Sequence, residues 1–121
     1  MAGAAPKIIA LVPDLLVASR IQAAARSANA QVETVDTPGE ALSRLEGDAA
    51  RLLIIDLALP GLDLPGLASA AQAAGAGIIA FGPHVDVALR QSALAAGIPH
   101  VYPRSRFLRD LPALLAYHVS G

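Results

Sequence analysis

Short apolar runs alternate with segments of helical period along the whole chain. Residues 7–12 and 51–55 are nearly continuous apolar runs, which are typical of strands buried on both faces of a parallel sheet. Residues 31–35 alternate polar and apolar positions instead, which predicts a strand with one exposed face. Two similar runs complete the set of expected strands, which are residues 7–12, 31–35, 51–55, 77–81 and 98–102.

Each expected strand is followed by a segment with the period of an amphipathic helix. Asp14 is placed to cap the first of these helices, in which we expect Leu16 and Ile21 to face the core. In the second helix we expect Leu42 to point inward together with Leu45. The expected helices are residues 15–28, 38–47, 65–74, 85–96 and 107–119.

The alternation of strand and helix with short connections predicts an α/β fold. Right-handed crossovers leave little choice but a parallel sheet with helices on both faces. The chain has 121 residues and a mass of 12.3 kDa, which is the size of one domain. We therefore expect a single domain over residues 1–121, with its core at about residues 7–119.

Composition excludes several classes of function. The chain has no cysteine, so it has no disulfide, thiolate metal site or cysteine nucleophile. The net charge of -1 argues against a nucleic-acid surface, and no stretch approaches the ~20 apolar residues of a membrane span. Residues 1–6 lack a basic segment, and no common catalytic motif is present. We expect a cytoplasmic, non-enzymatic protein that binds neither nucleic acid nor membrane.

The carboxyl ends of the strands are where ligands bind in open α/β sheets. Asp56 directly follows the most apolar strand, where burial of a carboxylate costs several kcal/mol unless a partner compensates. Two interpretations stay open: Asp56 caps the loop to Leu59, or it belongs to a functional site. His84 and Asp86 are candidates for a polar binding corner, but a loop histidine that caps the next helix is the favoured interpretation of His84.

Residues 53–63, with the sequence LIIDLALPGLD, carry the most specific motif of the chain. They resemble the third strand, phosphoacceptor aspartate and following loop of response-regulator receiver domains, which act in two-component and phosphorelay signalling. Residues 95–97 and 101–107 look like the fourth helix and fifth strand of that family. The resemblance covers essentially the whole chain and implies a flavodoxin-like (βα)5 fold with strand order 2-1-3-4-5. It also implies that Asp56 is the phosphoacceptor.

Most of the other positions that the family uses for phosphorylation are changed in this sequence. In receivers, two acids after the first strand help to hold Mg²⁺, a hydroxyl follows the fourth strand, and a lysine follows the fifth. Asp14 matches the second acid, but the first is Pro13. The hydroxyl position is Gly82, the lysine position is Arg104, and the proline after that lysine is Ser105. The resemblance therefore implies a degenerate phosphate pocket.

These changes favour a pseudo-receiver that keeps the fold and contacts a partner protein without phosphorylation. We expect Arg104 to pair permanently with Asp56 and to hold one conformation. No cofactor is expected, because Asp14 and Asp56 alone would bind Mg²⁺ only weakly. Two alternatives stay open. One is a weak phosphoacceptor that uses Asp56, and the other is a sensor of a small molecule or anion in a crevice of Asp14, Asp56, His84 and Arg104.

The expected working surface is formed by the fourth helix, fifth strand and fifth helix, where receivers commonly dimerise. The fourth helix is rich in small apolar residues, so its outer face is expected to be more apolar than that of a lone monomer. Arginine and tyrosine often anchor interfaces, so a homodimer or a protein partner is expected to use Arg90, Arg106, Arg109 and Tyr117. His100 and His118 are expected to be packing residues. The arginines that open the fifth helix suit an anion or a solvated helix start.

Overall fold

The computed structural model describes residues 5–47 and 49–120, so the ends of the expected domain at 1–4 and 121 lie outside the described residues. The strands are β1 (Lys7–Leu11), β2 (Gln31–Val35), β3 (Ala50–Asp56), β4 (Gly77–Gly82) and β5 (His100–Pro103). The helices are α1 (Leu15–Ser27), α2 (Pro38–Gly47), α3 (Leu64–Ala73), α4 (Val87–Ala95), α5 (Arg104–Arg109) and α6 (Leu111–Ser120).

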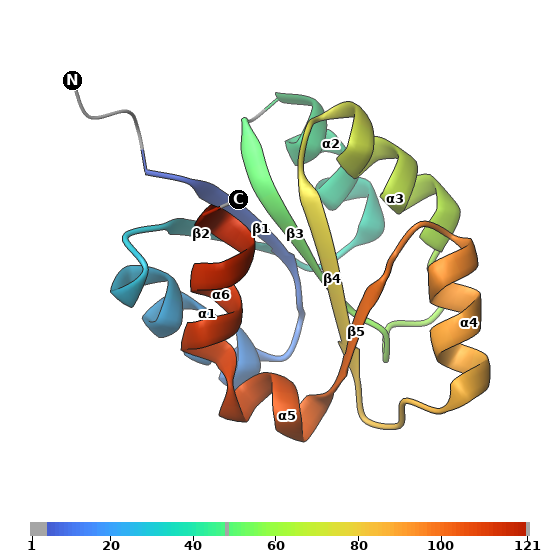
Figure 1. Cartoon of the computed structure of the whole chain (residues 1–121). Helices are drawn as coiled ribbons and strands as arrows, with labels where there is room; N and C mark the ends of the chain where they lie inside the picture. The colour runs from blue at the N-terminus through green and yellow to red at the C-terminus, as the bar shows by residue number, and fades with distance from the viewer. Residues whose placement is uncertain (1–4, 48, 121) are drawn as a thin grey trace.

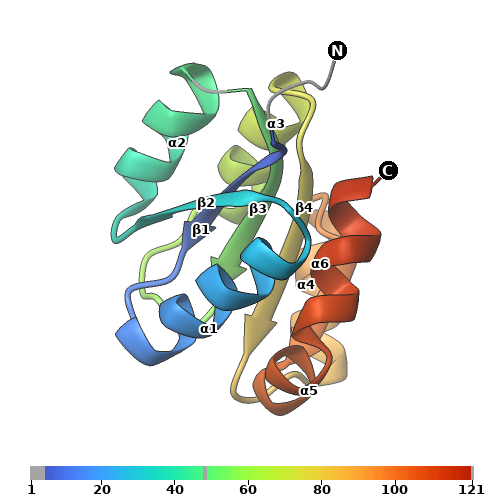
Figure 2. The same cartoon turned by 90° about the vertical axis from the view of Figure 1, so that its left-hand side faces the viewer.

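The strands form one parallel sheet in the order β2-β1-β3-β4-β5. Helices α1, α5 and α6 cover one face, and α2, α3 and α4 cover the other (Figures 1 and 2). The predicted doubly wound α/β fold and its strand order are therefore confirmed. The register pairs Asp56 with Phe81 and Gly82 with Pro103, which brings the carboxyl ends of β3, β4 and β5 to one edge.

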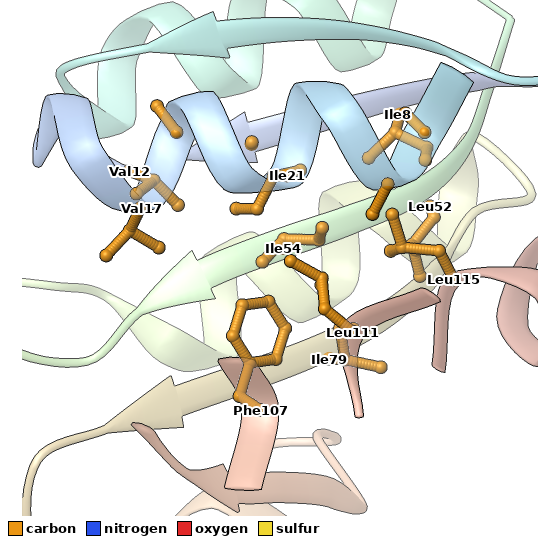
Figure 3. Close-up of a cluster of buried hydrophobic side chains, with 14 of the residues drawn as sticks. Ile8, Val12, Val17, Ile21, Leu52, Ile54, Ile79, Phe107, Leu111 and Leu115 are labelled. Carbon is orange, nitrogen blue, oxygen red and sulfur yellow. The ribbon is translucent and has the colours of Figure 1, made fainter. Parts of the chain in front are cut away.

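The core face under α1, α5 and α6 is built around a pair of aromatic rings. Phe107 of α5 stacks on Phe81 of β4 with ring centroids 4.4 Å apart, and both side chains are buried. Figure 3 shows Phe107 beside Ile54, with Val17 and Ile21 of α1 packed over the sheet. Full burial of each such side chain contributes roughly 1.5–3 kcal/mol.

Strand β3 supplies both core faces, which explains its continuous apolar sequence. Leu52 and Ile54 point to the cluster under α1 and α6, whereas Leu53 and Ile55 point to the cluster under α2 and α3. All four side chains have no exposed surface. Successive strand residues face opposite sides of the sheet, so a strand covered on both sides has no polar face.

Two side chains expected in the core lie elsewhere. Leu16 is 71% exposed, and Val17 takes the buried position beside Ile21. Each helical residue turns about 100°, so residues four apart share a face and residues five apart do not. Leu42 is 37% exposed, because the buried stripe of α2 runs through the residues four apart that end at Leu45.

The expected final helix at 107–119 is two helices, α5 and α6, and that prediction was wrong. Pro112 has no amide hydrogen to donate to the carbonyl of Leu108, so a continuous helix would lose a bond there. The Nη2 of Arg20 donates to that carbonyl instead, at 3.1 Å. The helix is interrupted at Asp110, and α5 begins at Arg104, directly after β5.

Other boundaries shift by about two residues. Strand β5 begins at His100 instead of residue 98, although Ile98 is buried. Helix α4 begins at Val87 instead of residue 85, because the Oδ1 of Asp86 accepts a hydrogen bond from the amide of Leu89 at 2.8 Å. None of the helices within residues 5–47 and 49–120 is long and apolar enough to cross a membrane.

Candidate functional site

Asp56 is the one buried charged side chain among the described residues, with 8% of its surface exposed. It is the last residue of β3, and its Oδ1 accepts a hydrogen bond from the amide of Ala58 at 2.9 Å. Its backbone carbonyl accepts from the amide of Leu59 at 3.2 Å. Asp56 therefore caps the loop to Leu59, as one of the two open interpretations expected. It takes part in no ion pair with any described residue.

Asp14 has both carboxylate oxygens engaged. Its Oδ1 caps α1 by accepting from the amides of Leu16 at 2.9 Å and Val17 at 3.2 Å. Its Oδ2 accepts from the Nη2 of Arg104 at 2.8 Å. The hydrogen bond from Val17, followed by that from Arg104, lowers the pKa of Asp14 below its ordinary value. Asp14 is thus an ionised helix cap with a cationic partner.

The expected ion pair between Arg104 and Asp56 was wrong, because the structure joins Arg104 to Asp14. The reason lies in the layers of the fold. Helix α5 begins at Arg104 and lies on the same face of the sheet as α1, so the guanidinium reaches the cap at the start of α1 (Figure 2). The side chain of Arg104 is 40% exposed and that of Asp14 is 37% exposed, so water screens this pair.

Gly82 ends β4 at a position where a side chain would meet apolar neighbours. A Cβ built on Gly82 would lie 3.4 Å from the Cβ of Leu57 and 3.9 Å from the Cγ2 of Val85. The space beside Gly82 is therefore lined by hydrocarbon. A glycine also offers no hydroxyl to an oxyanion at this edge.

Among the described residues, His84 and Ser105 form no hydrogen bond or ion pair with Asp56. His84 is exposed, and the side chain that caps α4 is that of Asp86. The structure therefore confirms neither the polar corner nor the helix cap that was expected of His84. Ser105 is exposed on α5. Of the four residues expected to form a crevice for a small molecule or anion, Arg104 and Asp14 are joined to each other, whereas Asp56 is bonded to its own loop.

The oxygen donors at this edge do not fit a magnesium site. Mg²⁺ demands near-octahedral oxygen ligation and usually takes one or two carboxylates together with water or phosphate. Asp56 is one such ligand, but both oxygens of Asp14 are already bonded, and Pro13 has no carboxylate. Within the described part of the chain, no group of three acidic or histidine side chains is arranged to hold a metal ion.

The three arginines predicted at the interface make contacts within the chain. The Nη1 of Arg90 donates to the carbonyl of Val101 at 2.8 Å and joins α4 to β5. Arg109 pairs with Asp110 at 3.1 Å, and the guanidinium of Arg106 lies 5.7 Å from the ring centre of Tyr102.

Helix α4 exposes two large apolar side chains, together with the polar residues Arg90, Gln91 and Ser92. Val87 is 69% exposed and Leu94 is 62% exposed. Tyr117, on α6, is 71% exposed. The sequence reasoning did not anticipate the exposed Leu15 and Leu16 at the start of α1, which are 84% and 71% exposed. The helical spacing contains this information, because Leu16 is five residues from Ile21 and therefore lies off the buried face of the helix.

Comparison with solved structures identifies the architecture. A response regulator from Hahella chejuensis matches with a TM-score of 0.84 at 20% identity, over 96% of each chain. A response regulator from Thermotoga maritima matches with a TM-score of 0.82 at 15% identity, over 97% of this chain and 99% of that chain. The receiver domain of a sensor histidine kinase from Pseudomonas aeruginosa matches with a TM-score of 0.78 at 21% identity, over 98% of this chain and 100% of that chain.

This chain has the receiver-domain fold. No family model and no curated protein matches its sequence. The receiver structure from Pseudomonas aeruginosa has a magnesium ion coordinated in its active-site cleft. At the corresponding edge of this receiver fold, Asp14 is bonded to Arg104, and Asp56 is bonded to a backbone amide.

Proposed function

We propose that this chain is a cytoplasmic pseudo-receiver, a signalling module that acts by protein–protein contact without phosphorylation and without catalysis. The observation that carries the proposal is the pair between Arg104 and Asp14, together with the cap that Asp14 forms on α1. These bonds engage the acid and the base that would otherwise serve a phosphoryl group on Asp56.

A phosphoryl group on Asp56 would lack support from its surroundings. It would add a charge of about -1.5 to -2 to a carboxylate whose Oδ1 is already bonded within its own loop. Arg104 would have to leave Asp14, and Gly82 has no hydroxyl to donate. The sequence has one lysine, Lys7, which is at the start of β1 and therefore at the far end of the sheet. Its Nζ lies 3.1 Å from the Oε1 of Glu33. A modification with so little stabilisation is not expected to work as a switch.

The outer face of α4 is the proposed contact surface for a second copy or a protein partner. Val87 and Leu94 are two helical turns apart, so they lie on the same side of α4. Arg90 joins α4 to the carbonyl of Val101, which fixes the position of this side relative to β5. Gln91 is exposed between them on the same side, so this surface offers two apolar contacts and one amide at a position set by β5. A contact surface whose position is set before binding costs less to order on binding.

Incubation with acetyl phosphate and Mg²⁺, followed by intact mass spectrometry, tests phosphorylation independence. We expect no stoichiometric phosphoryl adduct on the wild-type chain. The triple variant Pro13→Asp, Gly82→Ser, Arg104→Lys should gain an adduct, because it restores the acid, the hydroxyl and the lysine. That adduct should vanish when Asp56→Asn is added. A stoichiometric adduct on the wild-type chain that Asp56→Asn removes would support the weak-phosphoacceptor function instead.

Sedimentation velocity over a wide concentration range tests self-association through α4. We expect Val87→Glu with Leu94→Glu to weaken association, since each places a charge on the proposed contact. The matched control is Leu15→Glu, an equally exposed leucine on α1. Arg90 is kept, because changing it would disturb β5 itself. A wild-type chain that stays monomeric at high concentration removes self-association. A purified partner whose affinity is the same for the wild type and the double variant removes the α4 surface.

A further inference from the structure

Two histidines from separate elements meet at the end of the sheet opposite Asp56. His100 is the first residue of β5, and His118 lies in the last turn of α6. Their ring centroids are 4.9 Å apart, with the ring planes at 65°. Both rings line an open groove of about 670 Å³, whose other wall is formed by Ser69 and Gln72 of α3. This groove is separate from the edge of the sheet that carries Asp14 and Asp56.

The spacing of the two rings is that of two imidazoles on one metal ion. With a Zn–N bond of about 2.0–2.1 Å and a ring nitrogen about 1.1 Å from its ring centre, two imidazoles at a tetrahedral angle have centres about 5.2 Å apart. The observed separation is 4.9 Å. The ring of His100 belongs to an exposed residue, so it is able to turn about its own side-chain bonds without disturbing the core.

A second contact orients His118. The hydroxyl of Tyr102 lies 3.2 Å from the Nε2 of His118, within hydrogen-bond distance. Metal-bound imidazoles characteristically use one nitrogen for the metal and donate from the other to an oxygen. With the Nε2 hydrogen donated to Tyr102, the lone pair of Nδ1 is left for a ligand. The guanidinium of Arg106 over the ring of Tyr102 helps to hold that tyrosine in place.

The surroundings of the groove favour a cation. Helices α3, α4 and α6 all end at the side of the sheet where β4 and β5 begin (Figure 1). Helix carboxyl ends carry negative partial charge, which attracts cations. At the end of α6 the Nη1 of Arg51 already donates to the carbonyl of Val119 at 2.8 Å, so the ends of α3 and α4 supply this charge to the groove. No lysine or arginine is among the described residues that line the groove.

We propose that His100 and His118 form a two-imidazole site for a divalent transition-metal ion of the zinc class, with water or a groove ligand in the remaining positions. The ion binds His118 through Nδ1, and Tyr102 acts as the positioning residue. Imidazole nitrogen suits zinc, nickel and copper better than magnesium or calcium. A bound ion would tie the edge strand β5 to α6.

Calorimetric titration of untagged, chelator-treated full chain with Zn²⁺ tests the site. We expect one ion per chain, with binding lost in His100→Gln and in His118→Gln. His84→Gln is the matched control, because His84 lies at the opposite edge of the sheet, and it should bind like the wild type. Tyr102→Phe should weaken binding by about tenfold, as expected when an outer partner of a metal ligand is removed. Thermal melts in the presence of chelator check that each variant folds.

Several results would overturn the proposal. These are an absence of Zn²⁺ binding to the wild type, equal affinity in His100→Gln, or a loss of binding in His84→Gln. If His118→Gln does not fold, His100→Gln still decides, because the side chain it replaces belongs to an exposed residue. Nitrogen-15 NMR of the imidazole rings adds a second readout. Zn²⁺ should shift the Nδ1 signal of His118, and a shift confined to its Nε2 would contradict the role of Tyr102.

Discussion

Replacing Phe107 by alanine removes the side chain that anchors α5 to the sheet. Phe107 has no exposed surface, and its ring stacks on that of Phe81 at 4.4 Å. Truncation of a buried phenylalanine to alanine costs about 3–5 kcal/mol, through lost burial and the cavity left behind. The stacked pair contributes about 0.5–1.5 kcal/mol of its own, so the upper half of that range is expected. Small domains have about 5–15 kcal/mol in total, so Phe107→Ala should remain folded but weakened.

Urea unfolding followed by far-ultraviolet circular dichroism measures this loss, since the chain has no tryptophan for fluorescence. With a urea m-value of about 1–3 kcal/mol/M, the midpoint should fall by about 2 M. Leu15→Ala is the control, because Leu15 is 84% exposed and its truncation should change stability by less than about 0.5 kcal/mol. A loss below about 1 kcal/mol for Phe107→Ala would show that α5 is held by other contacts.

Three further outcomes are expected from the charged and titratable groups. Burial and the neighbouring His100 lower the pKa of His118, so its pKa is lower in the folded chain than in the unfolded chain. The free energy of unfolding should therefore be highest above about pH 6.5 and should fall as the pH drops below that value. Urea midpoints at several pH values should show this fall in the wild type and a smaller one in His118→Gln. Arg104→Ala should raise the pKa of Asp14 only part of the way to its ordinary value, because the amides that Asp14 caps remain. NMR titration of the Asp14 carboxyl carbon measures this pKa, and an unchanged value would contradict the ion pair between Arg104 and Asp14. Arg90→Ala should cost about 1.5–3 kcal/mol, because it leaves the carbonyl of Val101 without a charged donor, and unchanged urea unfolding would show that water replaces the bond.

The sequence alone was sufficient for the fold class. Five apolar runs alternate with helical segments, and the alternation admits few topologies once crossovers are right-handed. The apolar run of β3 also predicted burial on both faces, which the opposite orientations of Leu53 and Ile54 confirm. Local signals of this kind depend on residues within one element, so they can be read without knowing what lies across the sheet. Asp56 was placed at the carboxyl edge for the same reason.

Only the tertiary structure decided which charged groups meet. Sequence position put Asp14, Asp56 and Arg104 at one edge, but the choice between the two carboxylates depends on which face of the sheet α5 covers. Because α5 packs on the side of α1, Arg104 pairs with Asp14, and Asp56 turns to its own loop. The approach of His100 to His118 was equally beyond local reasoning. Those residues lie on different elements, and only the packing of α6 against the sheet brings their rings to within 4.9 Å.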